Sequence, residues 1–281
     1  MAAQGRRGRE RTAGAGAGCL PARPRPWLLV LLLASAAAPA APLQILGADV
    51  PPLIYLKDER PEGFCVDVLR ELQRRLRDDA PVQLLPWTRA IARAQQERDV
   101  LLVCPKRTPE REEQFHWVGP LFPSRTFFYV RRESTLRIAS LEEARALSGV
   151  LVPRASYTQD MLAARGFGNL VPTTGTGMTG LRMLLAGREP ALVLEERQMQ
   201  ALLRDAGLPA DSVRPAYPAL LVDSYFAFSR STAPARVLEW QRALGEMKRD
   251  GSFERLYRHW FDTAPPAELL QPGPPAPRRG G

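Results

Sequence analysis

The chain has 281 residues, 45% of them hydrophobic, which is enough for one large or two modest domains with a sizeable core. Its net charge of +9 is unevenly distributed, because residues 1–41 carry six arginines against one glutamate and the C-terminal tail adds Arg278 and Arg279. The remainder is mildly basic and has no basic stripe interleaved with aromatic residues, which argues against a nucleic-acid partner.

Residues 1–41 have the pattern of an export signal, so the sequence predicts a periplasmic protein. An arginine-rich segment precedes the apolar run WLLVLLLASAAA, Trp27–Ala38, which is followed by the small residues APAAP. This run is shorter than the roughly 20 apolar residues that a membrane-spanning helix needs. We expect cleavage between Ala36 and Ala41, and an uncleaved N-terminal anchor is the alternative.

After this leader, strand and helix patterns alternate, which is typical of an α/β unit. The apolar residues of GFCVDVLRELQRRLRDD recur at helical spacing, and TRAIARAQQERD is a second amphipathic helix, with Thr88 as its predicted N-cap. Three strand patterns accompany them: LQILGADVPPLIYL before the first helix, PVQLLPW between the two helices, and the buried-strand run VLLVC after the second.

The next segment, RTPEREEQFHWVGPLF, contains an arginine in an unusual position. Thr108 suits a helix N-cap and Pro109 suits the first helical position. A capping box would then place Glu or Gln where the chain has Arg111. Because a cation is disfavoured near the positive end of a helix dipole, Arg111 is a candidate binding residue. The alternative is an ion pair with Glu110, Glu112 or a residue of a neighbouring lobe.

The second half of the chain continues the alternation. RTFFYVRRES is a strand, SLEEARAL begins a helix that Ser140 caps with Glu143 as its box partner, and SGVLVPRASYTQDMLAARG is strand, loop and helix. TTGTGMTGLRMLLAGR is a turn and helix, and ALVLEERQMQALLRDAG is a strand that runs into a helix. LLVDSYFAFSR is a further strand, followed by two helices that Gly251 separates and by a tail rich in Pro and Gly.

These elements predict an α/β protein of two lobes, each a small mixed sheet flanked by helices. We expect lobe 1 to comprise residues 42–124 and 223–262, lobe 2 residues 125–222, and a disordered tail residues 263–281. The chain would cross twice between the lobes and form a hinge there. A ligand site is expected in the cleft between them, near the carboxyl ends of the strands.

Two cysteines remain after the leader, Cys65 and Cys104. Export permits a disulfide between them, and two buried free thiols are the alternative. The only histidines are His116 and His259, and no paired Cys-x-x-Cys spacing occurs. Neither a metal site nor a cofactor is therefore predicted.

Four segments carry a family resemblance by their joint order: EGFCVDVLREL, DVLLVCPKRTPEREEQFHWVGPLF, REPALVLEERQMQALL and YFAFSRSTAPARVLEWQRALGEMKRDGSFERLYRHWF. They match, in turn, the start of a first long helix, an Asp-strand-Thr-x-x-Arg segment, the strand before an acidic ligand contact, and a closing hinge strand with its helices. Over about residues 43–262 the chain resembles the family 3 extracellular solute-binding proteins, periplasmic receptors for polar amino acids and related molecules. The resemblance implies their two-lobed, type II periplasmic-binding-protein fold.

The resemblance also implies a set of ligand contacts. Arg111 matches the family arginine that pairs with the ligand's carboxylate, and a guanidinium binds a carboxylate through two charge-assisted hydrogen bonds. The acidic contact for a ligand ammonium falls at Glu196, with Glu195 as the alternative. Tyr55 and Trp87 occur where family clefts place aromatic faces against the ligand, and ordinary packing is the alternative for each.

In the second lobe, the family's polar loop at a helix N-terminus corresponds to PRASYT, which makes Arg154, Ser156 and Tyr157 candidates. The chain departs from the family just before Thr-x-x-Arg, where CPKR replaces small or hydroxyl residues. Lys106 is therefore a further candidate, and a solvated charge on the rim is the alternative. The site is expected to be more cationic than an amino-acid site.

The leading hypothesis is an exported, monomeric, non-catalytic protein that captures a small polar, carboxylate-bearing ligand such as an amino acid. Its lobes would close around the ligand and present it to a membrane partner, an ABC-type permease or a sensor. One alternative is a degenerate site that serves as a sensory or interaction module. The other is an enzyme like the cyclohexadienyl dehydratases of the family, with an acid–base pair among Glu195, Glu196 and His116.

Overall fold

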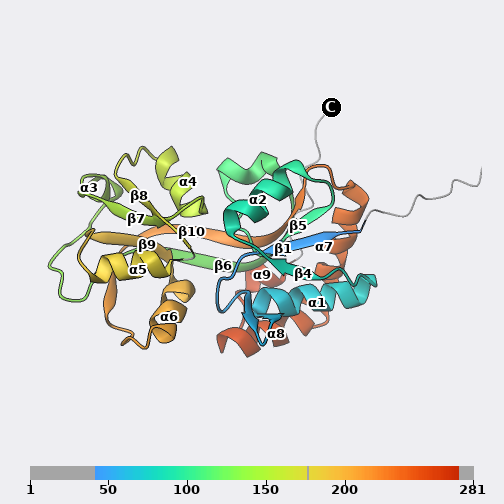
Figure 1. The fold of residues 1–281 in the computed structure, drawn as a ribbon. Helices are drawn as coiled ribbons and strands as arrows, with labels where there is room; N and C mark the ends of the chain where they lie inside the picture. The colour runs from blue at the N-terminus through green and yellow to red at the C-terminus, as the bar shows by residue number, and fades with distance from the viewer. Residues whose placement is uncertain (1–41, 176, 272–281) are drawn as a thin grey trace, which may run out of the picture. The chain divides into compact units, whose positions relative to one another are not determined.

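The computed structural model describes residues 42–175 and 177–271, and most of the strands join one mixed sheet (Figure 1). The sheet consists of β1 (Gln44–Gly47), β4 (Val82–Leu84), β5 (Val100–Leu102), β6 (Phe115–Arg131), β7 (Val150–Pro153), β8 (Leu170–Thr173), β9 (Ala191–Glu195) and β10 (Val213–Ser229). The strand order is β4-β1-β5-β10-β6-β9-β7-β8. A separate hairpin pairs β2 (Tyr55–Lys57) with β3 (Arg60–Glu62).

A long antiparallel ribbon of β6 and β10 occupies the centre of this sheet. Each of the two strands has 17 residues. At one end of the ribbon β10 pairs with β5, which belongs to the parallel group β4-β1-β5. At the other end β6 pairs with β9, which belongs to the parallel group β9-β7-β8. The two parallel groups are thus joined within the sheet by the ribbon, as a two-lobed α/β fold requires.

Helices pack on both parallel groups. Those on the β4-β1-β5 side are α1 (Phe64–Leu76), α2 (Trp87–Gln96), α7 (Pro234–Arg249), α8 (Ser252–Phe261) and α9 (Ala267–Leu270). Those on the β9-β7-β8 side are α3 (Leu141–Arg145), α4 (Tyr157–Ala164), α5 (Met178–Leu185) and α6 (Glu196–Asp205). A 3-10 helix, η1 (Pro109–Gln114), precedes β6.

Two helix starts follow from local chemistry, and for the second the sequence predicts the cap. α1 begins at Phe64, directly after Gly63, whose φ of 123° lies in the region that favours glycine. α3 begins after Ser140, whose side chain accepts a 3.2 Å hydrogen bond from the backbone N–H of Glu143. The glutamate side chain in turn accepts from the N–H of Ala139, so the reciprocal pattern of a capping box is shifted by one residue.

Two other helix starts differ from the predictions in detail. Thr88 does not cap α2, because this helix already begins at Trp87 after Pro86, and the threonine lies within its first turn. Thr108 does stand at the N-cap of η1, with Pro109 in the first position, but its side chain makes no capping hydrogen bond. At Thr108 the sequence therefore predicts where the helix starts but not a capping hydrogen bond, and at Thr88 it predicts neither.

The ribbon strands are longer than their sequence patterns indicate. β6 begins at Phe115 rather than at Arg125, and β10 begins at Val213 rather than within LLVDSYFAFSR. Prolines in these stretches read locally as turns, yet the ladder accommodates Pro215 and Pro218 beside register shifts in the β6–β10 pairing. The long-range pairing of the two strands thus overrides the local turn signals.

Each parallel group has its own buried apolar clusters. The cluster on the β1 side centres on the ring of Phe64, whose centroid lies 5.6 Å from that of Phe122 and 5.7 Å from that of Tyr257. On the β7 side, Phe128 stacks on Phe167 at 6.0 Å between centroids. Two separate cores flanking one ribbon are the arrangement in which a site between them can form.

The C-terminal end of the described chain corrects one prediction. Disorder was expected from residue 263 onward, but Ala267–Leu270 form α9, and Leu269 is buried in the same cluster as Phe64. The predicted leader, residues 1–41, and residues 272–281 lie outside the described part. Within the described part, no helix combines the length and apolar character needed to cross a membrane.

Candidate functional site

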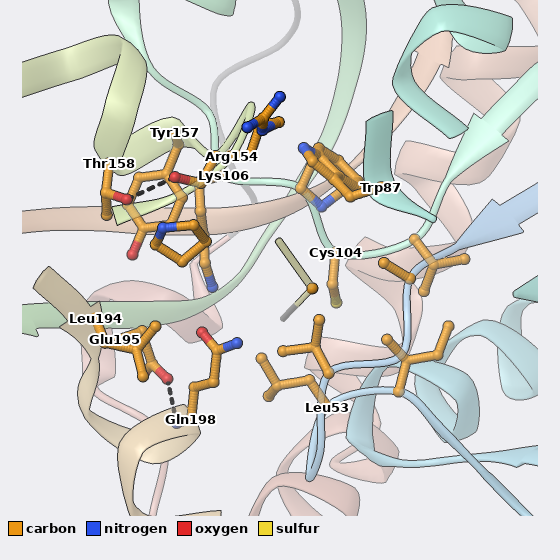
Figure 2. Close-up of a pocket in the computed structure, with 18 of the residues that line it drawn as sticks. Leu53, Trp87, Cys104, Lys106, Arg154, Tyr157, Thr158, Leu194, Glu195 and Gln198 are labelled. Carbon is orange, nitrogen blue, oxygen red and sulfur yellow. Dashed lines mark hydrogen bonds between the residues drawn. The ribbon is translucent and has the colours of Figure 1, made fainter. Parts of the chain in front are cut away.

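A pocket lies at the carboxyl ends of β1 and β5 on one side and of β7 and β9 on the other (Figure 2). Parallel strands bring their carboxyl ends to the same edge of a sheet, and ligand sites in α/β proteins form there. We call this the strand-end pocket, and its lining comprises Ala48, Val50, Leu53, Ile54, Trp87, Val103, Cys104, Pro105, Lys106, Arg111, Pro153, Arg154, Ser156, Tyr157, Thr158, Gly175, Leu194, Glu195 and Gln198.

The strand-end pocket is small. Its volume is about 130 Å³, close to the ~150 Å³ of an apolar cavity that admits benzene. A second hollow of about 470 Å³ shares Ala48, Trp87, Arg154 and Gly175 with its lining, so the two lie next to each other. A compact group fits the first, and a longer molecule would extend into the second.

Arg111, predicted as a binding residue, lines the pocket and is only 3% exposed. It lies in η1 and reaches across to α4, where Asp160 accepts hydrogen bonds from its Nε at 3.2 Å and its Nη2 at 2.6 Å. The guanidinium also lies over the ring of Trp87, 5.6 Å from the centroid. Its ion-pair partner is thus a residue on the other side of the pocket, rather than Glu110 or Glu112.

A backbone carbonyl from the second parallel group receives two donors from the first. The carbonyl of Ala155 accepts from Arg111 Nη2 at 3.1 Å and from the indole N–H of Trp87 at 2.9 Å. Ala155 has a φ of 53°, unusual for a residue with a side chain, and its N–H donates to Gln159 at 2.7 Å. These contacts hold a strained turn in place at the pocket wall.

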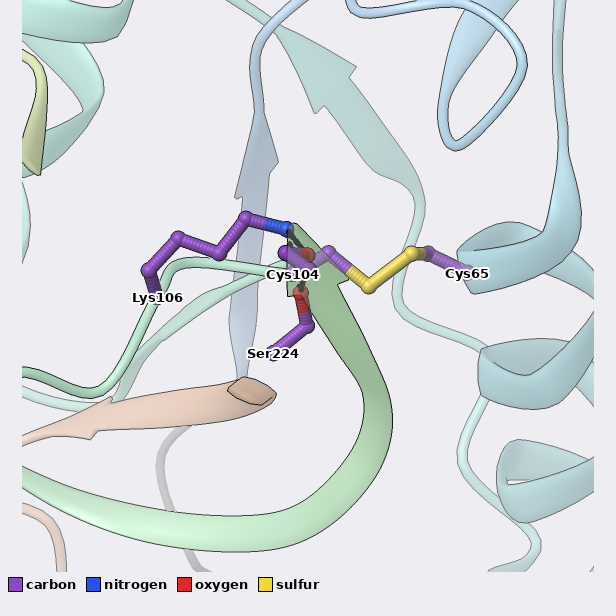
Figure 3. The surroundings of a disulfide bond; sticks show 5 residues. Cys65, Cys104, Lys106 and Ser224 are labelled. Atoms are coloured by element: carbon purple, nitrogen blue, oxygen red, sulfur yellow. Dashed lines mark hydrogen bonds between the residues drawn. A yellow bond between two sulfur atoms is a disulfide. The ribbon is translucent and has the colours of Figure 1, made fainter. Parts of the chain in front are cut away.

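Lys106, predicted as a candidate with a solvated rim charge as the alternative, is buried at 7% exposure. Its Nζ donates to Ser224 on β10 (Figure 3) and to Ser124 on β6, each at 2.5 Å. It also lies 4.4 Å from the centroid of Phe122. Burial lowers the pKa of this lysine to about 8, although the nearby carboxylate of Glu195 acts in the opposite direction. The amine is therefore still mostly protonated at neutral pH.

A disulfide fixes the loop that carries this lysine. Cys104, which lines the pocket, is bonded to Cys65 of α1, with 6.2 Å between their Cα atoms (Figure 3). Of the two alternatives left by the sequence, the structure has the disulfide. It ties the end of β5 to the first core and restricts the position of the lysine two residues further on.

The acidic side chain in the pocket is Glu195, not the preferred Glu196. Glu195 is 3% exposed and caps α6, accepting from the N–H of Gln198 at 2.9 Å. Figure 2 shows it beside Gln198 on the wall that the amine end of Lys106 faces. Glu196 lies outside the lining and pairs with Arg125 at 2.7 Å.

All three candidates of the PRASYT loop line the pocket. Ser156 is the N-cap of α4, and the phenol of Tyr157 shares a 2.6 Å hydrogen bond with Thr126 on β6. Burial raises the pKa of Tyr157, and the charge of Glu195 adds to this rise, so the phenol stays protonated. Arg154 extends from the same loop and is exposed.

Tyr55 lies away from the pocket lining. Its ring makes an edge contact with Trp260 of α8, 6.5 Å between centroids. Trp87, the other predicted aromatic contact, does line the pocket. Whether any of the predicted side chains touches a ligand stays a prediction.

The sequence reasoning missed three residues that the structure brings to the charged groups of the pocket: Asp160, Ser124 and Ser224. Asp160 follows Ser156 on α4 and reads as an ordinary first-turn acid of that helix. The two serines are isolated within long strands. Only the long-range register of β6 and β10 places them beside the lysine, so no local signal would have found them.

A metal centre has no donor set here. Among residues 42–175 and 177–271, no cluster of three or more His, Cys, Asp or Glu side chains could hold a metal ion. His116, considered as an acid or base, lies outside the lining, with its Nε2 3.2 Å from the carbonyl of Arg230. The acid–base pair that a dehydratase would need is therefore reduced, among the proposed residues, to Glu195 alone.

Sequence comparison identifies a family. The sequence model of bacterial extracellular solute-binding proteins, family 3, matches residues 45–263, most of the chain. No curated protein sequence shows a significant match.

Solved structures share the fold. A histidine kinase sensor domain with similarity to periplasmic binding proteins has a TM-score of 0.73 at 20% identity, covering 81% of this chain and 99% of its own. The arginine-, lysine-, histidine-binding protein ArtJ from Geobacillus stearothermophilus has a TM-score of 0.70 at 17% identity, covering 82% and 99%. The ancestral amino acid-binding protein AncCDT-1, a precursor of cyclohexadienyl dehydratase, has 0.64 at 19%, covering 78% and 94%. At these identities the similarity establishes the fold and leaves the ligand open.

Proposed function

Because this chain belongs to the family 3 bacterial extracellular solute-binding proteins, we propose that it is an exported protein that holds one small anionic molecule in the strand-end pocket without converting it. The observation that carries the proposal is the buried ammonium group of Lys106 at the wall of a pocket lined mainly by apolar side chains. A buried charge of this kind is costly to maintain unless a partner meets it, so it marks a site where an anion is favoured.

The charges around the pocket favour an anion. Lys106, Arg111 and Arg154 line it against one carboxylate, Glu195. Arg111 already has a carboxylate partner, whereas Lys106 hydrogen-bonds neutral serine hydroxyls. An ammonium group has three N–H donors, and the serines accept two of them. The third donor of Lys106 is the group that we propose meets the ligand's carboxylate.

The body of the ligand should be compact and largely apolar. Leu53, Ile54, Val103 and Leu194 form much of the wall, and the volume is close to that of a benzene site. A ligand that also carries an amine would find Glu195 on the side of the pocket opposite Lys106 and Arg111. These properties suit a small carboxylic acid or an amino acid with an apolar side chain.

We further propose that residues 42–124 with 223–262 and residues 125–222 act as two lobes that close on the ligand about the β6–β10 ribbon. The liganded form would be presented to an ABC-type importer in the membrane, as in other members of the family. A sensory role is the second candidate, since a histidine kinase sensor domain has the same fold. Loss of ligand uptake after deletion of the gene, without loss of a transcriptional response to the ligand, distinguishes the importer role from the sensory one.

A third candidate is a module without a ligand, and the pairing of Arg111 with Asp160 favours it. In that case the arginine expected to receive a carboxylate would serve only to join the two sides of the pocket. Binding of an anion in the pocket would then depend on Lys106 alone. A measurement of anion binding therefore distinguishes the proposed function from a module without a ligand.

A thermal-shift screen tests the proposed function. The purified protein is unfolded and refolded, with the disulfide intact, to remove any bound molecule. It is then screened against small carboxylates, each beside its neutral amide, and against amino acids and amines. A ligand at 100 times its Kd adds about 2.7 kcal/mol of stability. We expect carboxylates to stabilise the protein and their amides not to. No stabilisation by any carboxylate, or equal stabilisation by amides, would contradict the proposal.

A further inference from the structure

The ion pair between Arg111 and Asp160 has an unusual distribution of exposure. The arginine is 3% exposed, whereas 39% of the aspartate side chain is accessible to solvent. Both Nε and Nη2 of the guanidinium donate to the same oxygen, Oδ2 of Asp160. The pair therefore consists of a buried cation that lines the pocket and a partly exposed carboxylate that lies outside the lining.

The surroundings of Arg111 hold it in place independently of Asp160. Nη2 donates to the carbonyl of Ala155, and the guanidinium lies over the ring of Trp87. The same carbonyl accepts from Trp87, so the arginine, the indole and the strained turn form one connected unit. If Asp160 rotated into solvent, the arginine would keep these contacts, and the donors now paired with Asp160 would be free to meet another carboxylate beside the pocket that the arginine lines.

We propose that Asp160 is a specificity-determining residue: its carboxylate occupies Arg111, so that a ligand carboxylate reaches this arginine only by displacing Asp160. The inference rests on the proposed function, in which the strand-end pocket takes an anionic molecule. It assigns the two cations different roles. Lys106 receives the anion, and Arg111 is withheld from it by a residue of the chain itself.

The consequence for ligand choice follows from competition. A molecule that requires Arg111 binds only the fraction of protein in which Asp160 is displaced, and its apparent affinity is its intrinsic affinity multiplied by that fraction. A free amino acid that places its carboxylate against the arginine is therefore selected against. A molecule whose carboxylate meets Lys106 is not affected. The site thus discriminates by the position of the ligand's carboxylate and not only by its presence.

Removal of the competing carboxylate tests this. Asp160→Asn keeps the shape of the side chain and removes its charge, and Asp160→Ser is a second variant in case the first does not fold. The probes are sodium benzoate and sodium acetate, titrated by calorimetry at constant ionic strength to separate specific binding from screening. We expect both probes to bind at least tenfold more tightly to either variant than to the wild type. The double variant Arg111→Met, Asp160→Asn should lose this gain.

Glu112→Gln is the matched control. Glu112 lies in the same helix as Arg111 and forms a two-bond ion pair with Arg107 at 2.5 and 2.7 Å, but neither residue lines the pocket. This variant should bind both probes as the wild type does. An equal gain in Glu112→Gln would overturn the inference, because the effect would then be one of net charge.

The outcomes separate the inference from the proposed function. If the folded Asp160 variants bind the probes no more tightly than the wild type, the inference is wrong, whether or not the wild type binds a carboxylate through Lys106. If the variants gain affinity while the wild type binds nothing in the screen, the inference stands and the proposed function fails. The arginine would then be a carboxylate site that the chain itself keeps filled.

Discussion

Lys106 donates a hydrogen bond to Ser224, a residue 118 positions further along the chain. The lysine follows β5 and the serine lies on β10, where the ribbon leaves the first parallel group for the second. The same amine also holds Ser124 on β6. One buried cation therefore connects the pocket to both strands of the ribbon, and its protonation is expected to affect both binding and stability.

Affinity for an anionic ligand should depend on pH through this lysine. Burial lowers the pKa of Lys106 to about 8, so the positive charge that attracts the anion is present below this pH and lost above it. For benzoate or a sulfonate, whose own charge is constant in this range, the affinity should be flat up to pH 7. It should then fall toward tenfold per pH unit above pH 8. Calorimetric titration from pH 6.5 to 9.5 measures this. An affinity that is unchanged up to pH 9.5 would show that Lys106 does not receive the anion.

Stability should rise with pH in the same range. Lys106 and Lys248 are both buried with a pKa lowered to about 8, against an ordinary value of 10.5. Between these values the unfolded chain binds more protons than the folded one. The free energy of unfolding therefore increases with pH, by up to about 1.4 kcal/mol per pH unit for each lysine. Denaturant unfolding between pH 8 and 9.5 measures the slope, below the pH at which tyrosines of the unfolded chain ionise.

Lys248→Met is the informative variant for this slope. Among the described atoms, the Nζ of Lys248 is buried without a hydrogen-bond partner, and it lies 5.6 Å from the centroid of Phe253. A methionine of similar length removes the buried charge. We expect the variant to be more stable than the wild type at pH 7 and to show about half of its pH slope. A variant that is less stable with an unchanged slope would refute the assignment of a destabilising charge to Lys248.

The Cys65–Cys104 disulfide should contribute substantially to stability. It closes a loop with a sequence separation of 39, for which the chain-entropy relation gives about 4 kcal/mol. The double variant Cys65→Ser, Cys104→Ser should lose about 3–4 kcal/mol of unfolding free energy in denaturant titrations. Because Cys104 lines the pocket, ligand affinity should fall as well. A double variant as stable as the wild type would mean that the bond does not form in the purified protein.

Trp87→Phe should separate the hydrogen bond of the indole from its ring. The ring over Arg111 is retained, while the 2.9 Å bond to the carbonyl of Ala155 is lost, at about 1 kcal/mol of stability. Trp260→Phe is the control, since its indole donates at 2.8 Å to Asp67, away from the pocket. Both variants should lose similar stability, but only Trp87→Phe should weaken ligand binding in calorimetry. Equal effects of the two on affinity would remove Trp87 from the site.

The parts of the fold that the sequence predicts well are those set by local patterns. The break between α7 and α8 at Gly251, whose φ is 75°, follows from the glycine, and α1 follows from the helical spacing of its apolar residues. The α/β alternation predicts a ligand site at the carboxyl ends of the strands, and a pocket lies there, whereas ligand binding in it stays a prediction. The extent of β6 and β10 did not follow, because their pairing with each other decides it.

The side-chain partners within the site were not predictable from local sequence. Lys106 finds Ser124 and Ser224 at separations of 18 and 118 residues, and Arg111 finds Asp160 at 49. Each partner is unremarkable in its own segment. Contacts of this kind depend on the register of distant elements. The sequence indicated only that Arg111 is unusual near a helix start and that Lys106 departs from the family pattern.

The most direct test of the anion-binding account is the affinity of the strongest carboxylate from the screen for three proteins at pH 7. These are the wild type, Lys106→Met and Lys248→Met, measured by titration calorimetry. Both variants remove a buried lysine with a pKa near 8, but only Lys106 lines the pocket. The account predicts that Lys106→Met loses at least a hundredfold in affinity and that Lys248→Met binds as the wild type does. Undiminished binding to Lys106→Met would contradict it.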